Sequence, residues 1–166
     1  SMLGADLEKI SDKIYGSDNP AKVAIIYDKE SKWALNQSQG PRNCGLDYDN
    51  LCAQYYKYFW QNGIGVDVLD SRSDFEDYKI VIAPLLYMFH NDIQQKMRNF
   101  VERGGILLST AFSGVVDEND LCFLGEATQE KLSDVLGMWV EETDALFDEE
   151  ANETSWNQNT YIYVVS

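Results

Sequence analysis

The most regular feature of the chain is a set of short apolar runs rich in β-branched residues. Runs of this kind, without alternating polar positions, are typical of strands that are covered on both faces, as in parallel sheets. Pro84 is expected at the end of its run, because proline cannot donate to a central ladder. The predicted strands are Lys22–Tyr27, Val66–Leu69, Lys79–Leu86 and Ile106–Ser109.

Two segments between these runs carry apolar residues at helical spacing. One helix is predicted over Tyr48–Asn62, with Asp47 as its N-cap and Gly63 as its stop. The other is predicted to begin after Asn91 as N-cap and to end at Gly104-Gly105. The positions of this second helix that are expected to face the sheet are Ile93, Met97, Phe100 and Val101.

The two ends of the chain carry further elements. A short amphipathic helix is predicted over Ala5–Tyr15, and another helix over Thr128–Leu136 followed by a strand around Met138–Val140. The segment Glu141–Glu153 is acidic without a balancing base, which is typical of a solvated loop or tail. Thr160–Val165 has strong strand character and is expected at the edge of whatever it pairs with.

Alternating strands and helices with short connections predict the fold class. Parallel strands need crossover connections, and these place helices on the faces of the sheet. We therefore expect an α/β fold, a flavodoxin-like three-layer domain with a mostly parallel sheet flanked by helices. The length of 166 residues suits one such domain.

The charge of the chain limits its partners. Its 28 acidic and 13 basic side chains give a formal net charge of -15, so that its field repels polyanions. Neither a nucleic acid nor a membrane is expected as a partner. No signal-like or membrane-spanning run occurs, so a cytoplasmic location is expected if this is a natural chain and not an excised domain; the sequence leaves both open.

Hydroxyl groups and one histidine are the candidates for catalysis. Ser109, Thr110 and Ser113 follow the fourth apolar run, and His90 follows the third. The glycine-flanked nucleophile elbow of many α/β hydrolases is missing, and we expect His90 to be a partly exposed loop residue. A hydrolase or amidotransferase that uses these residues stays open, as does a small-molecule binding module at the carboxyl ends of the strands.

Metal and cofactor sites are not predicted. Cys44, Cys52 and Cys122 are an odd number of cysteines at unrelated spacings, and Cys52 is expected in the core. The run Asp117–Asp120 lacks the spaced ligands of a calcium-binding loop and is expected to form a turn with side-chain caps.

Aromatic residues make up 13% of the chain. Those of the first long helix cover most of its circumference, so they cannot all face one core. They and Trp33, in the expected loop after the first strand, suit subunit contacts, or else they cover the domain's own core. The helix positions are Tyr55, Tyr56, Tyr58, Phe59 and Trp60.

Several stretches of the chain resemble the middle domain of glycoside hydrolase family 42 β-galactosidases, and the resemblance covers roughly Ala5–Leu146. The most specific is Ser113–Gly125 (SGVVDENDLCFLG). The other stretches are Ala21–Leu35 (AKVAIIYDKESKWAL), Asp77–Leu86 (DYKIVIAPLL) and Val101–Ser113 (VERGGILLSTAFS).

The resemblance implies a non-catalytic role. In that family the middle domain has a class I glutamine amidotransferase-like fold without the catalytic cysteine, and it mediates trimerisation. The parent would be a retaining β-galactosidase acting on terminal β-D-galactosides, with its catalytic glutamates on a separate barrel. Residues 1–18 would be a linker helix from that barrel and residues 19–166 the trimerisation domain, shortened at its C-terminal end because the match fades beyond Phe147.

The resemblance also implies where neighbours meet. Trp33 and the loop Asp117–Leu124 would lie at or near the subunit contact or the neighbour's substrate cleft, and the partners would be the chain itself, as a homotrimer, and the catalytic barrel. The candidate contact residues are Trp33, Asp117, Glu118, Asn119, Asp120 and Phe123.

Overall fold

The apolar runs form strands, and the periodic segments between them form helices. The computed structural model describes residues 2–16, 20–38, 46–90, 92–122, 135–136, 152–156 and 159–163. In chain order the elements are α1 (Met2–Ile14), β1 (Val23–Ile26), α2 (Lys29–Gln37), α3 (Tyr48–Gln61), β2 (Val66–Leu69), β3 (Ile80–Ala83), α4 (Ile93–Glu102), β4 (Ile106–Ser109), β5 (Asn152–Trp156) and β6 (Asn159–Tyr163).

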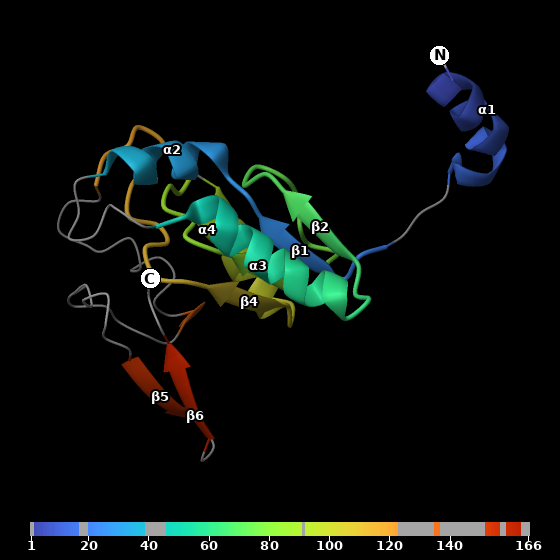
Figure 1. Ribbon diagram of the computed structural model, residues 1–166. Coiled ribbons are helices and arrows are strands. Elements are labelled where there is room, and N and C mark those ends of the chain that lie inside the picture. The colour runs from blue at the N-terminus through green and yellow to red at the C-terminus, as the bar shows by residue number, and fades with distance from the viewer. Residues whose placement is uncertain are drawn as a thin grey trace.

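The first four strands form one parallel sheet in the order β2-β1-β3-β4 (Figure 1). Val23 of β1 is in register with Val66 on one side and Ile80 on the other, and Ile80 in turn lies beside Ile106. This order is the beginning of the flavodoxin-like arrangement, in which the chain reverses direction across the sheet between β1 and β3. The predicted fold class is confirmed.

Successive residues of β1 face opposite sides of the sheet, and each side is covered by a different helix. Val23 and Ile25 pack with Tyr55 and Phe59 of α3, which crosses in front of the sheet in Figure 1. The alternate positions of β1 pack against α4 instead. The residues of α4 that join this core, as predicted, are Ile93, Met97, Phe100 and Val101.

Helix α3 forms as its sequence predicts. The Asp47 carboxylate accepts a hydrogen bond from the backbone N–H of Asn50 at 3.1 Å, and Gly63 follows the helix with a φ of 69°. Not all of its aromatic residues reach the core, since Tyr58 and Trp60 are 64% and 66% exposed.

Helix α2 was not predicted. The Asp28 carboxylate caps it by accepting from the backbone N–H of Ser31 at 2.6 Å. Trp33 therefore stands on a helix, and the expectation that it lies in a loop was wrong.

The start of α4 differs from the prediction. Its N-cap position is Asp92, whose side chain makes no capping hydrogen bond, while the predicted cap Asn91 lies outside the described residues. The Asp92 carboxylate instead pairs with Lys96 at 3.0 Å.

The last strands form a separate hairpin. β5 and β6 pair antiparallel, with Asn152 beside Tyr163, so part of the predicted strand Thr160–Val165 is confirmed. The expectation of a loop or tail up to Glu153 was wrong at its end, because β5 begins at Asn152.

The remaining predictions near the ends have mixed outcomes. Helix α1 begins earlier than predicted and lies away from the sheet in Figure 1, with Leu7 and Ile10 about half exposed. Of Thr128–Leu136, only residues 135 and 136 are described; they are helical and pack against the core beside α4. The predicted strand around Met138–Val140 lies outside the described residues.

Two glycines with the same backbone conformation allow a test of the packing of Phe89 against Gly114. Gly63 and Gly114 have φ angles of 69° and 68°. A Cβ atom added at Gly63 would meet nothing within 4 Å, whereas a Cβ atom added at Gly114 would lie 2.6 Å from the ring of buried Phe89. We expect Gly63→Ala to cost about 1–2 kcal/mol, the penalty of this backbone conformation. Gly114→Ala should cost about 1–3 kcal/mol more because the ring must move. Urea unfolding measures both, and equal losses would contradict the described packing.

The buried thiol of Cys52, on α3, makes stability depend on alkaline pH. Burial raises the pKa of Cys52 to about 11. The unfolded thiol ionises near its ordinary value of about 8.5, so its contribution to stability is complete below that pH and is lost as pH rises toward 11. The free energy of unfolding of Cys52→Ala should therefore fall less steeply across this range than that of the unaltered chain. Free energies of unfolding that fall equally steeply with pH in Cys52→Ala and in the unaltered chain would contradict the prediction.

Candidate functional site

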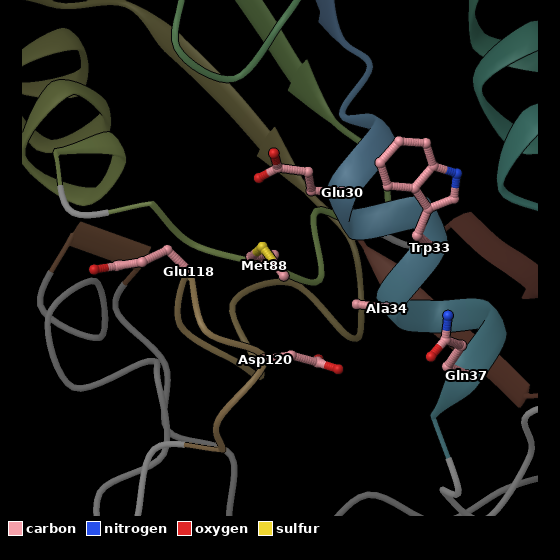
Figure 2. A pocket seen from close by; sticks show the side chains of 7 residues that line it. All are labelled: Glu30, Trp33, Ala34, Gln37, Met88, Glu118 and Asp120. Atoms are coloured by element: carbon pink, nitrogen blue, oxygen red, sulfur yellow. The ribbon is translucent and has the colours of Figure 1, made fainter.

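A pocket of about 310 Å³ lies at the carboxyl edge of the parallel sheet. Helix α2 follows β1, Met88 follows β3, and the turn that begins at Asp117 follows β4, so three connections meet at one edge. Figure 2 shows α2 on one side of the pocket, Met88 near its centre and Glu118 on the other side. The residues that line it are Glu30, Trp33, Ala34, Gln37, Met88, Glu118 and Asp120.

Helix α2 forms one wall of the pocket and is fixed by its buried face. Its residues Ser31, Ala34 and Leu35 are buried, whereas Trp33 is 60% exposed. The Ser31 hydroxyl accepts a hydrogen bond from the backbone N–H of Met88 at 2.9 Å. This bond joins the helix to the segment after β3, which passes near the centre of the pocket.

The opposite wall is a turn built on Asp117. The Asp117 carboxylate accepts hydrogen bonds from the backbone N–H groups of Asn119 at 2.8 Å and Leu121 at 3.0 Å, as predicted for a turn with side-chain caps. These two bonds, that from Leu121 foremost, lower the pKa of Asp117. Val116 forms isolated bridges with Met88 and with Cys122, which join the turn to the segment after β3.

The structure brings three of the six predicted contact residues to this pocket, namely Trp33, Glu118 and Asp120. Asp117 and Asn119 belong to the turn that carries Glu118 and Asp120, and Phe123 lies outside the described residues.

Four further lining residues were not predicted: Glu30, Ala34, Gln37 and Met88. Had α2 been recognised, helical spacing would have indicated the first three, because Glu30 and Gln37 lie three residues before and four residues after Trp33, and Ala34 lies four residues after Glu30.

A buried polar network fixes the start of α2. The carboxylate of Asp28 is fully buried; besides capping Ser31 it accepts a hydrogen bond from the Ser71 hydroxyl. The backbone N–H of Asp28 donates to the Tyr48 hydroxyl at 2.8 Å. Ser71 follows β2 and Tyr48 begins α3, so the network joins segments that are distant in the sequence.

His90 belongs to the same network, and the expectation that it is partly exposed was wrong, since only 8% of it is exposed. Its Nε2 lies 3.4 Å from Asp28 Oδ2 and 3.3 Å from Glu30 Oε2, within ion-pair range but without hydrogen-bond geometry. Glu30 also accepts from Arg72 at 2.7 Å, which holds it at the rim of the pocket.

The hydroxyls proposed as nucleophiles are not paired with His90 Nε2. Thr110 Oγ1 accepts from the backbone N–H of Leu85 at 2.7 Å and donates to the carbonyl of Ala111 at 3.2 Å. The Ser113 hydroxyl and His90 Nε2 are both buried without a hydrogen-bond partner. A nucleophile and its base must lie within hydrogen-bond reach, so this geometry gives no support to a hydrolase built on Nε2.

The other predictions of site chemistry concern cysteines, metals and membranes. Cys52 is buried, as predicted, Cys122 is exposed and Cys44 lies outside the described residues. Within the described part of the chain, no group of three or more metal-binding side chains is placed to hold an ion. Nor does any helix there have the length and apolar character needed to span a membrane.

The importance of the Asp28 network can be measured against a matched cap. Asp28 and Asp47 both cap a helix through the N–H three residues on, but Asp47 is exposed and Asp28 also meets Ser71 and His90. We expect Asp47→Ala to cost about 1 kcal/mol, the typical value of an N-cap. Asp28→Ala should cost about 3–5 kcal/mol, because it leaves buried partners unpaired. Unfolding in urea gives both values, and a similar cost for the two would mean that the network contributes little.

Comparison with known proteins identifies the family. Residues 21–164 match the family described as the β-galactosidase trimerisation domain, of glycoside hydrolase family 42. β-Galactosidase Pbg of Clostridium perfringens is 46% identical over 155 residues, which are 93% of this chain and 22% of that protein. BglY of Alicyclobacillus acidocaldarius is 42% identical over 148 residues, 89% of this chain and 21% of that protein.

Solved structures agree with this match. Gan42B, a family 42 β-galactosidase from G. stearothermophilus, is 38% identical with a TM-score of 0.84, over 97% of this chain and 23% of that one. The β-galactosidase of Bacillus circulans sp. alkalophilus is 37% identical with a TM-score of 0.85, over 97% of this chain and 24% of that one. The chain thus spans less than a quarter of the length of these proteins, and it belongs to the trimerisation-domain family of glycoside hydrolase family 42 β-galactosidases.

Proposed function

We propose that this chain is the unit that joins three copies of a larger β-galactosidase and that it supplies no catalytic group itself. The observation that carries this proposal is the match to the β-galactosidase trimerisation domain over residues 21–164. Relatives that are named β-galactosidases are about four times as long as this chain, so most of their length lies outside the part matched here. The parent would cleave terminal β-D-galactosides with catalytic residues that lie outside this domain.

We assign separate roles to the first residues of the chain and to the rest. Residues 1–18 would connect a preceding catalytic barrel to the trimerisation domain of residues 19–166. Helix α1 is consistent with this role, because its apolar residues Leu7 and Ile10 are about half exposed and available for contact with another domain.

The pocket at the carboxyl edge is our candidate for the subunit contact or the neighbour's substrate cleft. Trp33 is the one aromatic residue among the seven that line it and is 60% exposed, and tryptophan is enriched among residues that dominate binding energies. The hydrogen bonds of Ser31 and Asp117 hold the two walls in place. A rigid wall that carries an exposed aromatic side chain loses little entropy when a partner binds.

Trp33 can be tested against a second tryptophan of similar exposure. In the full-length parent, Trp33→Ala should weaken trimer association by at least about tenfold, whereas Trp60→Ala on α3 should leave it unchanged. Trp60 is 66% exposed and does not line the pocket, so it controls for the loss of an exposed indole. Light scattering across a dilution series measures the association.

The possible results separate the parts of the proposal. An unaltered trimer in Trp33→Ala would exclude Trp33 from the contact, and an effect of Trp60→Ala alone would move the contact to α3. A parent that is monomeric at all concentrations would overturn the proposed assembly function itself.

A further inference from the structure

A set of exposed apolar residues lies along one side of α3 and continues onto β2. Its four members follow one another at intervals of four residues, and each is between 41% and 66% exposed. They are Tyr56, Trp60, Ile64 and Val68, and we call them the α3–β2 patch. Single exposed apolar residues are common on protein surfaces, whereas several that lie together indicate that another surface packs against them.

The four residues lie on the same side of the domain. Tyr56 and Trp60 are neighbours on the surface of α3, because residues four apart share a helix face. Leu51, on the opposite side of this helix from Trp60, packs against the buried cluster that contains Met88, beyond β3. Trp60 therefore lies on the side of β2. Val68 points to the face of the sheet that α3 covers, as its register partner in β1 does.

The chain enters the parallel sheet beside this patch. Val23, the first residue of β1, is in register with Val66, which follows Ile64 by two positions. Figure 1 shows that the chain reaches β1 at the end of the sheet where α3 ends and β2 begins. The pocket lies at the other end, at the carboxyl edge of the strands. A domain that is connected through residues 1–18 would therefore start next to the α3–β2 patch and away from the pocket.

The size of the patch favours a partner in the same chain. A stable contact between separate proteins buries about 800 Å² on each partner and involves about 20–30 residues of each. Four side chains provide only a fraction of that area. A domain tethered beside the patch needs less contact, because a short linker holds the two surfaces at an effective concentration in the millimolar range. Relatives about four times as long as this chain have room for such a domain.

We propose that the α3–β2 patch packs against the domain that precedes residues 19–166 in the parent, within the same subunit. The surface that covers it would be apolar, with a hydrogen-bond acceptor for the Trp60 indole N–H. This inference rests on the proposed role of residues 1–18 as the connection from that domain. It assigns the two ends of the sheet to different partners, since the pocket at the carboxyl edge is our candidate for contact with a neighbouring subunit.

A thiol probe at Ile64 tests whether the patch is covered. Ile64→Cys should react with N-ethylmaleimide about tenfold more slowly in the full-length parent than in this chain, because a docked surface is open to the reagent for only a small part of the time. Glu102→Cys, at an exposed position of α4, should react equally fast in both proteins. Peptide mass spectrometry separates these thiols from the three native cysteines. Hydroxyl-radical modification of Trp60 in the unaltered proteins should show the same protection without any substitution.

A second substitution tests which domain covers the patch. In the parent that carries Ile64→Cys, adding Trp60→Ala should raise the rate of labelling toward the rate in this chain, because the indole contributes to the contact. Light scattering should show that the trimer remains intact. Adding Trp33→Ala instead should weaken the trimer and leave the labelling rate of Ile64→Cys low, since a contact within one subunit does not depend on concentration.

Three results would overturn the inference. Equal labelling of Ile64→Cys in this chain and in the parent would mean that nothing covers the patch. Protection that disappears when the trimer dissociates, or a trimer weakened by Trp60→Ala, would assign the patch to a neighbouring subunit. The assembly function can fail separately: a monomeric parent in which Ile64→Cys stays protected would overturn assembly and support the contact within the subunit.

Discussion

The geometry of the pocket depends on one buried carboxylate. Asp28 follows the first strand, caps the helix that begins after it and accepts a hydrogen bond from Ser71, beyond the second strand. His90, beyond the third strand, faces the same carboxylate. A buried polar group is stable only when its surroundings satisfy it, so the three connections must keep their relative positions for Asp28 to keep these partners. Trp33 lies five residues after Asp28, on the helix that Asp28 caps, so its position depends on these contacts.

At the carboxyl edge of the parallel sheet, polar side chains join the connections to one another. In open α/β folds this edge collects the connections that bind ligands, because successive strands deliver their loops to the same place. Here the polar groups closest to the strand ends are occupied with holding the connections together, as Asp28 and Thr110 illustrate. The exposed groups lie one layer further out, on α2 and on the Asp117 turn. This outer layer is the part of the edge that we propose as a contact, in a chain that belongs to a trimerisation-domain family.

The sequence predicts the sheet and its two covering helices well, because their signals are local. Continuous apolar runs mark the strands, and helix α3 carries both its periodicity and its Asp47 cap within a few residues. Helix α2 escaped prediction because its apolar residues, Trp33 to Leu35, are consecutive and show no period. The burial of His90 escaped prediction for a different reason, since it depends on carboxylates more than fifty residues away in the chain. Trp33 and the Asp117 turn were selected by resemblance, and only the fold places Trp33, Glu118 and Asp120 around one pocket.

The central claim is that this domain holds copies of a larger enzyme together. The mass of the full-length parent in solution, measured by sedimentation equilibrium, tests it most directly. The account predicts three copies per particle over a wide range of concentration. A particle that contains a single copy throughout that range would contradict it.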